Sequence, residues 1–434
     1  MRGFLKRSEF SRNVATVMSG NVAGQVIAVA AAPVITRLYT PEQFAILALY
    51  SATVAIIVRV GCLCYERSIM LPSDNRDAVA AASLSFLILI CTCLLLAALA
   101  IPFRESIAGI VGNDEFAQWV PMVIVGALLI GSGNIARFWA MRQKRFGLIS
   151  MAHVSNAGVG AAAKISLGMM MVSRAGGLVV GTIVGNLIGL LMLLGNLRSD
   201  AARAPRLRPI ARNAELLRAT AKRYRQFPLF ATWNGLLNVG SEQAAIFLLS
   251  AFYAPAIVGF YSLSGRLLKQ PIIALASAVM NVYFKKSATQ VSNNESLLPG
   301  MRKVSTVLFL LGVVPFGILG AFGGPLFGFV FGAEWRTAGV YAQVLSPWFF
   351  LLFVMGPSKV LFEVFEKQHV RLFVNIVTAV VRVAALWLGH VFLQEPVLVI
   401  AVFAGVNSVM EIVLFAVAVF VTRGRDRSLQ RQGV

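Results

Sequence analysis

Charged residues are scarce in this sequence. Asp, Glu, Lys and Arg make up only 13% of its 434 residues, whereas 58% are apolar and the mean hydropathy is +0.77. A soluble globular domain contains about 25% charged residues. The composition therefore excludes an ordinary soluble protein and indicates a polytopic membrane protein.

Residue types that build catalytic and metal sites are also few. The three histidines, His153, His369 and His390, are scattered and form no ligand set. The four cysteines form two i, i+2 pairs in apolar helical segments, Cys62 with Cys64 and Cys91 with Cys93. Residues two apart on a helix point in different directions, so neither pair forms a metal site or a disulfide by itself. The sequence indicates no cofactor, no metal and no catalytic residue.

Enzyme motifs and large outer domains are missing as well. No GxGxxG motif follows a strand, and the GxxxxGK[ST], HExxH and CxxC motifs are absent. None of the loops expected opposite the cytoplasm exceeds about twenty residues, which leaves no room for an extracytoplasmic catalytic domain. A transporter is favoured over an enzyme.

Twelve windows are long and apolar enough to cross a membrane, because a spanning helix needs roughly 20 mostly apolar residues. They lie near residues 13–37, 44–64, 79–101, 118–139, 148–172, 177–197, 228–252, 256–283, 303–323, 338–361, 371–392 and 397–421. The N-terminus resembles a signal peptide, but its apolar part is longer than an h-region of about 7 to 15 residues. We therefore expect it to be an uncleaved first span.

Basic residues outnumber acidic ones by 39 to 18, and the net charge is +21. Such a surplus alone would suggest nucleic acid as a partner. However, 31 of the 39 cations fall at the N-terminus, the C-terminus and alternate loops, whereas the opposite loops hold only Arg37, Arg104, Arg174 and Arg336. This asymmetry is the positive-inside pattern. It predicts that both termini are cytoplasmic and that the protein does not bind nucleic acid.

The chain divides near its middle. Residues 198–225 carry nine cations together with Pro205 and Pro209. We expect residues 1–197 and 227–422 to be two six-helix lobes joined by a basic cytoplasmic linker at 198–226, with a cytoplasmic tail at 423–434. An alternative role for the linker is binding to anionic lipid headgroups.

A weak internal repeat supports this division. At one constant offset, Tyr39 aligns with Tyr253 and Pro41 with Pro255, in the joint between the first and second spans of each half. The same offset aligns Ala45 with Gly259 and Leu49 with Leu263. Because each half contains an even number of spans, the repeats are expected to be parallel, related by a pseudo-two-fold axis along the membrane normal.

Six ionisable residues lie near the middle of spans. They are Lys164, Glu242, Arg266, Lys269, Arg382 and Glu411. Each would cost roughly 3 kcal/mol if it faced lipid. Four are cations and two are anions, so complete pairing among them leaves two cations over. A central aqueous cavity with a cationic lining explains them better than pairing does.

Polar and small residues recur at steps of four beside these charges. Lys164 follows Asn156 and Gly160 and precedes Gly168, and Glu242 follows Asn234 and Asn238. Such spacing places each set on one helix face. The alternative is that small residues only allow helices to pack closely, while polar residues form interhelical hydrogen bonds. Prolines 33, 271, 347 and 357, within or beside spans, are candidate kink positions.

Four stretches resemble a known family. They are CYERSIMLPSDNRDAV at 64–79, YRQFPLFATWNGLLN at 224–238, FYAPAIVGFYSLSGRLLKQP at 252–271 and FGAEWRTAGVYAQVLSPWFF at 331–350. The sequence resembles the polysaccharide transporters, the Wzx-like O-antigen and exopolysaccharide-unit flippases of the MOP superfamily. That resemblance covers most of the chain. It implies an all-α fold of two six-helix lobes around a central cationic cavity, in the bacterial cytoplasmic membrane.

The resemblance also implies a substrate, an undecaprenyl-pyrophosphate-linked oligosaccharide moved between leaflets for O-antigen, capsule or exopolysaccharide synthesis. Its anionic headgroup would bind Arg266, Lys269, Arg382 and Lys164, with Asn238 alongside. Membrane lipid and other polysaccharide-assembly proteins are the further expected partners. Glu242 and Glu411 are candidates for ion coupling, or for restraining the cations.

Competing functions remain open. A cation-coupled drug or small-molecule antiporter of the same architecture is the nearest alternative, although a surplus of cations at membrane depth argues against a cationic substrate. A membrane glycosyltransferase, polymerase or ligase commonly needs a large outer loop, which is absent. A major-facilitator carrier would also have twelve spans, but the loop after the second span lacks that family's Gly/Asp/Arg-rich signature.

Overall fold

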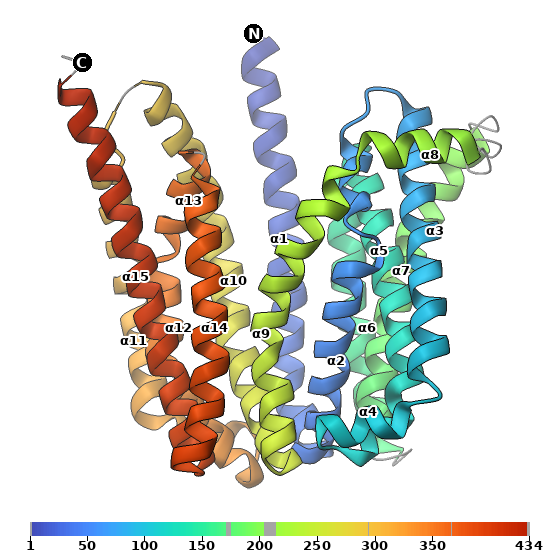
Figure 1. The fold of residues 1–434 in the computed structure, drawn as a ribbon, viewed down its shortest axis with the longest axis vertical. Helices are drawn as coiled ribbons and strands as arrows, with labels where there is room; N and C mark the ends of the chain where they lie inside the picture. The colour runs from blue at the N-terminus through green and yellow to red at the C-terminus, as the bar shows by residue number, and fades with distance from the viewer. Residues whose placement is uncertain (1, 171–174, 204–213, 294, 366, 432–434) are drawn as a thin grey trace. The chain divides into compact units, whose positions relative to one another are not determined.

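Helices make up every regular element in the described part of the chain (Figure 1). The structure is a computed structural model, and it describes residues 2–170, 175–203, 214–293, 295–365 and 367–431. Each predicted span lies within one long helix or reaches a few residues past its ends, except that the window at 338–361 covers two consecutive helices, Arg336–Val354 and Gly356–Val364. Residues 171–172 of the window at 148–172 lie outside the described residues. The all-α prediction is therefore confirmed.

The chain forms two compact units, Met1–Val258 and Gly259–Val434. The long helices of the first unit are α1 (Arg2–Leu38), α2 (Pro41–Gly61), α3 (Asn75–Ala100), α5 (Val120–Arg142), α6 (Phe146–Met169), α7 (Gly176–Arg203) and α9 (Thr232–Phe252). Shorter helices are α4 (Arg104–Val111) and α8 (Ala214–Arg223), together with a 3₁₀ turn, η1 (Tyr65–Met70), and a π-helical turn, Phe227–Ala231.

The second unit contains the remaining spans. They are α10 (Pro255–Ser292), α11 (Leu298–Phe331), α12 (Arg336–Val354), α13 (Gly356–Val364), α14 (Gln368–Leu393) and α15 (Pro396–Arg431). Helix α15 continues past residue 422, through most of the predicted tail. Most of the predicted linker is in α7, α8 or the turns after α8, and its residues 204–213 lie outside the described set.

The boundary between the units differs from the predicted lobes because α9 packs against α2 and α4. At the contact with α2, Gly235 lies so close to Arg59 that an added Cβ would be 1.8 Å from the guanidinium Nε. Contacts assign α9 to the first unit, whereas the internal repeat assigns it to the second half. The division into lobes at 1–197 and 227–422 therefore stays a prediction, which rests on the internal repeat of the sequence.

The two repeated joints have the same local construction. Tyr39 and Tyr253 each follow the last residue of a helix, and Pro41 and Pro255 each begin the next one. Proline suits the first helical position because its missing N–H would have no intrahelical partner there. At the first joint, the Gln43 side chain also accepts a hydrogen bond of 3.1 Å from the Thr40 N–H. The repeat therefore marks equivalent helix starts.

Ten helical segments of the described chain are long and apolar enough to cross a membrane. Many large apolar side chains on them are exposed, among them Leu310, Val314 and Phe392. In water such a surface would aggregate, whereas hydrocarbon solvates it. Helix α6 is not among these ten segments, and it carries the polar residues His153, Asn156 and Lys164. It nevertheless packs against α1 and α7.

Helices α6 and α7 pack through the stripe of small and polar residues predicted on the fifth span. The Asn156 amide donates to Asn186 Oδ1 at 2.8 Å, and an added Cβ on Gly185 would lie 2.6 Å from the Asn156 carbonyl oxygen. Gly160 also faces Gly185. In this stripe, small residues let the backbones approach and the amides bond across the interface. The packing interpretation is therefore correct for Asn156 and Gly160.

The loop after α2 is fixed by one arginine at the end of α5. The Arg142 guanidinium donates to the carbonyl oxygens of Ile69 at 3.2 Å, Pro72 at 2.6 Å and Ser73 at 3.3 Å, and to Asn75 Oδ1 at 3.2 Å. A planar guanidinium suits this role because it presents five donors in a fixed arrangement. Arg142 thus links the end of α5 to the loop that carries the family-like stretch at 64–79.

Helix α8 is attached to the same loop and to α3. The Tyr65 hydroxyl donates to the Ala221 carbonyl at 3.1 Å, and Arg223 forms an ion pair of 3.2 Å with Asp77. Glu66, next to Tyr65, lies in a confined position where burial raises the pKa of its carboxyl, while Arg67 and Arg59 partly oppose that shift. The end of the predicted linker therefore docks on the first unit.

Helix α11 breaks its regular geometry at Phe322, whose φ of −123° and ψ of 15° are not helical. Pro325 explains the break, because proline has no N–H for the carbonyl four residues earlier. The freed region is satisfied by Gln343 of α12, whose amide donates to the carbonyls of Gly320 and Ala321, each at 3.1 Å. The break is at none of the four prolines that the sequence singled out.

The α11–α12 contact at this break predicts a strong effect of one methyl group. An added Cβ on Gly339 would lie 2.1 Å from the Gly323 carbonyl oxygen, a backbone atom that cannot move aside. Gly339→Ala should therefore destabilise the protein by about 2 kcal/mol, within the range for overpacked cores. The measurement is thermal unfolding in detergent. Gly317→Ala on α11 is the matched control, because nothing lies within 4 Å of its Cβ position; equal stability of the two variants would contradict this packing.

Candidate functional site

Arg382 is the best-defined cation at membrane depth. It lies in the middle of α14, and its Nε donates a hydrogen bond to Oδ1 of Asn407 on α15. The Asn407 amide in turn donates to the Phe403 carbonyl at 2.7 Å, one turn earlier on α15. Asn407 is fully buried. The guanidinium is therefore oriented by an amide that is itself fixed in place.

One aromatic ring contacts this arginine, and further rings pack against that ring. Its guanidinium carbon lies 5.6 Å from the centroid of the Trp348 ring on α12, within the range of a cation–π contact. The Trp348 ring meets Phe403 edge-on at 5.6 Å, and Tyr261 of α10 meets Phe403 at 6.3 Å. Side chains of α12 and α15 thus contact one cation of α14 that is only half-buried, and α10 packs beside them through Tyr261.

A charged pair lies one turn further along α15. Lys359 of α13 donates a hydrogen bond of 3.1 Å to Glu411 Oε1, and its Nζ forms an ion pair with Oε2 at 3.0 Å. The side chains are 25% and 9% exposed, so water screens the pair poorly. Because Phe403, Asn407 and Glu411 follow at steps of four, they share one face of α15. We name the set Arg382, Asn407, Lys359 and Glu411 the α15 polar strip.

Arg266 and Lys269 lie on α10, apart from the packed face of that helix. Ser264 and Leu268 are buried, and the Ser264 hydroxyl contacts the Ala338 carbonyl at 2.6 Å. Arg266 is two residues from each of them, which places it about 200° around the helix from both. Arg266 is exposed and has no hydrogen bond or ion pair with another described residue, while Lys269 is half-buried.

Lys164 belongs to the first unit. Its stem packs against Gly181 of α7, where an added Cβ would lie 2.5 Å from the Lys164 Cγ. Its carbonyl accepts a hydrogen bond of 2.7 Å from the Tyr39 hydroxyl. The side chain is half-buried. The structure thus shows how the position is held, and the ammonium's role in substrate binding stays a prediction.

Asn238 and Glu242 lie one turn apart on α9, also in the first unit, and both are exposed. The Ser241 hydroxyl donates to the Asn238 backbone carbonyl at 3.0 Å, so this hydrogen bond does not involve the Asn238 side-chain amide.

Of the seven predicted site residues, the structure brings Arg382 and Glu411 into one strip. Arg266 and Lys269 are on another helix of the same unit, and Lys164, Asn238 and Glu242 are in the first unit.

Sequence reasoning missed Lys359 and Trp348 as members of this site. Lys359 lies near the end of the tenth predicted span, so a charge count assigns it to a loop and leaves Glu411 without its actual partner. Trp348 lies within the family-like stretch at 331–350. The sequence does contain a signal for Lys359, because this residue lies among apolar residues two positions after Pro357 in α13.

Within the described residues, no group of three His, Cys, Asp or Glu side chains could hold a metal ion.

The fold defines the class of protein. The structure is similar to the inward-facing conformation of a multidrug resistance MATE family transporter of the MOP superfamily, with a TM-score of 0.74 at 14% identity over 94% of this chain and 96% of that one. It is also similar to the inward closed conformation of lipid II flippase MurJ, with a TM-score of 0.67 at 9% identity over 94% and 87%. This chain therefore has the twelve-helix fold of MOP-superfamily transporters.

The family can be stated more narrowly. The profile of the family described as "Polysaccharide biosynthesis protein" matches residues 34–339, well over half of the chain. The protein belongs to that family. The sequence matches no curated protein. An outward-facing MATE transporter structure is a further structural relative, with a TM-score of 0.63 at 15% identity over 98% of this chain and 96% of that one.

The Lys359–Glu411 pair predicts a specific pattern of stabilities. Lys359→Met leaves a buried carboxylate without its partner and should lower the free energy of unfolding by about 3 kcal/mol. The double variant Lys359→Met/Glu411→Leu removes both charges and should recover most of that loss. Thermal or denaturant unfolding in detergent measures both.

The exposed pair Arg371–Glu363, at 2.8 Å on the same unit, is the matched control. Its side chains are 33% and 48% exposed, so neutralising either residue should change stability by less than about 1 kcal/mol. Two outcomes would contradict this prediction: equal losses of unfolding free energy at the two pairs, or a double variant as unstable as Lys359→Met. Either would show that water screens the charges of Lys359 and Glu411.

Proposed function

We propose that the protein is a flippase that moves undecaprenyl-pyrophosphate-linked oligosaccharide units across the bacterial cytoplasmic membrane by alternating access, for polysaccharide synthesis. Membership of a polysaccharide biosynthesis family supports this proposal, and so does a fold shared with a lipid II flippase. The basic loops support an orientation with both termini cytoplasmic. Other polysaccharide-assembly proteins are natural partners of such a step.

The observation that carries the proposal is Arg382, a half-buried arginine in the middle of a spanning helix. It is oriented by a hydrogen bond to Asn407 and a cation–π contact with Trp348. A charge in such a position is costly unless it serves a function. A pyrophosphate matches it, because guanidinium groups bind phosphate oxygens through paired, charge-assisted hydrogen bonds.

Arg266 and Lys269 supply the remaining positive charge of the proposed site in the second unit. Arg266 is exposed on the side of α10 away from the packed face, where a ligand can reach it. Lys164 and Asn238 are the proposed contributors from the first unit. The oligosaccharide has no motif-encoded contacts, so the conserved chemistry of the substrate, its pyrophosphate, is what these cations recognise.

Glu411 has a restraining role in this proposal. Both of its oxygens lie within 3.1 Å of Lys359 Nζ, so it balances that lysine. Glu242 is the better candidate for ion coupling, because it is exposed on its helix.

The alternative is a cation-coupled drug or small-molecule antiporter. It is favoured by the similarity in fold to a multidrug resistance transporter. The charge pattern opposes it, since three of the four charges named for the second unit are cations, and the remaining one, Glu411, is paired with Lys359. Deletion of the gene separates the two functions. A flippase predicts that lipid-linked oligosaccharide accumulates on the cytoplasmic face and that complementation reverses it, whereas an antiporter predicts no accumulation.

The cations of α10 provide a direct test. Arg266→Gln/Lys269→Gln, expressed at the normal level in the deletion strain, should lower transport at least about a hundredfold, because each charge-assisted hydrogen bond contributes about 1.5–3 kcal/mol. Arg302→Gln/Lys303→Gln at the start of α11 is the matched control, with the same loss of charge at exposed positions of the same unit. Wild-type transport by the α10 variant would refute the assignment of these two residues.

Arg382 predicts a graded series. Arg382→Gln removes the charge and should reduce transport more than tenfold, and Arg382→Lys should recover only part of the activity because an ammonium cannot donate two parallel hydrogen bonds. Transport of the lipid-linked oligosaccharide in spheroplasts is the measurement, with protein level and unfolding temperature as controls. A lysine variant as active as the wild type would show that only the charge matters.

A further inference from the structure

One face of α9 is exposed through the first half of the helix and the π-helical turn before it. Its members follow one another at steps of three and four, and all are exposed: Phe230, Trp233, Asn234, Leu237 and Asn238. Such spacing places them on one side of a helix. The other side is packed, since Gly235 is buried against Arg59 of α2. We call these five residues the exposed face of α9.

Large aromatic side chains are prominent on this face. Phe230 is 71% exposed and Trp233 is 62% exposed, and neither ring stacks on another ring or meets a cation in the described part of the chain. Leu237, one turn after Trp233, is also exposed. Two flat apolar surfaces are therefore available to a ligand within the first unit.

Lipid contact alone does not explain the face, because amides are interleaved with the apolar residues. The side chains of Asn234 and Asn238 are exposed, and neither forms a hydrogen bond with another described residue. Hydrocarbon offers no hydrogen-bond partner to such a group. The face therefore suits water or a polar ligand.

The face is also neutral, which distinguishes it from the proposed phosphate-binding cations. None of its five side chains carries a charge, while each amide supplies two donors and an acceptor. A sugar ring has the complementary chemistry, with C–H groups on its faces and hydroxyls at its rim. The negative face of an aromatic ring attracts C–H groups, and amides bind hydroxyls.

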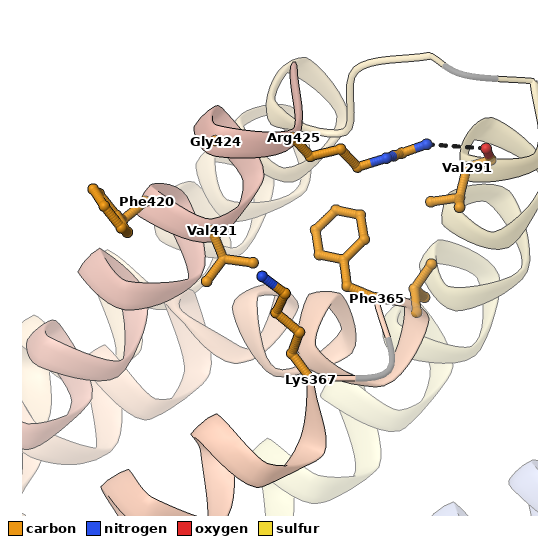
Figure 2. Close-up of a pocket in the computed structure, with 8 residues that line it drawn as sticks. Val291, Phe365, Lys367, Phe420, Val421, Gly424 and Arg425 are labelled. Carbon is orange, nitrogen blue, oxygen red and sulfur yellow. Dashed lines mark hydrogen bonds between the residues drawn. The ribbon is translucent and has the colours of Figure 1, made fainter. Parts of the chain in front are cut away.

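A cavity in the second unit provides a contrast. It has a volume of about 580 Å³ and lies at the end of α15, with the rings of Phe365 and Phe420 among its lining residues (Figure 2). No amide or hydroxyl side chain belongs to the eight described residues that line it. Rings and amides occur together on the exposed face of α9, so that face is the better match for a sugar.

We propose that the exposed face of α9 binds the oligosaccharide of the lipid-linked substrate. The rings of Phe230 and Trp233 would stack on sugar faces, and the amides of Asn234 and Asn238 would bind hydroxyls. This inference rests on the proposed function, and membership of a polysaccharide biosynthesis family supports a sugar as the ligand. Residues 230 and 238 are about 12 Å apart along the helix, so the face is longer than one sugar ring.

Two probes test the proposal on the purified, full-length protein in neutral detergent. They are the undecaprenyl-pyrophosphate-linked oligosaccharide extracted from the producing cells, and undecaprenyl pyrophosphate without sugar, and their affinities are measured by microscale thermophoresis. The wild type should bind the glycosylated probe more tightly. Trp233→Leu keeps an apolar side chain but removes the ring, and should weaken only the glycosylated probe, about tenfold.

Asn234→Leu is the second variant, and it keeps the test decisive if Trp233→Leu fails to fold. It should weaken the glycosylated probe about fivefold through the loss of hydrogen bonds to a neutral hydroxyl. Trp387→Leu on α14 is the matched control, because Trp387 is also an exposed tryptophan on a spanning helix, at 54%. It should leave both affinities unchanged.

The outcomes separate this inference from the proposed function. Failure of the wild type to bind either probe would overturn both. Equal affinity of the wild type for the two probes, or wild-type binding of the glycosylated probe by Trp233→Leu and Asn234→Leu, would overturn the sugar assignment alone. Tetraphenylphosphonium is the third probe, because tryptophan also binds cations. If Trp233→Leu weakened its binding and left the glycosylated probe unaffected, the face would belong to a cationic drug.

Discussion

The structure depends on one constraint, that hydrocarbon offers no hydrogen-bond partner to a backbone or side-chain polar group. Three departures from a regular apolar helix have a partner within the same unit. Gln343 satisfies the carbonyls freed by Pro325, Asn407 orients Arg382, and Lys359 binds Glu411. Arg266 is exposed and has no such partner among the described residues, and its binding of the substrate is a proposal.

Close backbone approach is the second means by which the bundle is assembled. Gly185 against Asn156 and Gly339 against Gly323 bring helices together where no larger residue fits. Between apolar helices in lipid there is little hydrophobic driving force, so van der Waals packing and interhelical hydrogen bonds take its place. The same small residues thus fix the scaffold that positions the charged side chains.

Much of the fold could be predicted from the sequence, because each span is a local property of about 20 apolar residues. The predicted windows match helices, and the repeated Tyr39 and Tyr253 joints have the same construction. The pairing of Glu411 with Lys359 could not be predicted, since it joins helices 52 positions apart. The stripe at Asn156 was ambiguous for a similar reason: spacing places residues on one face, and only a neighbouring helix shows whether that face meets water or protein.

The spacing of the α15 polar strip has a consequence for movement. Asn407 and Glu411 lie four residues apart, which is about 6 Å along the helix axis. A slide of α15 by that distance relative to α14 would put a carboxylate where Arg382 now meets an amide. The cation would then exchange a neutral partner for an anion, and Lys359 would lose its own. Asn407 and Glu411 are therefore spaced close to the one-turn step of about 5.4 Å by which packed helices change register.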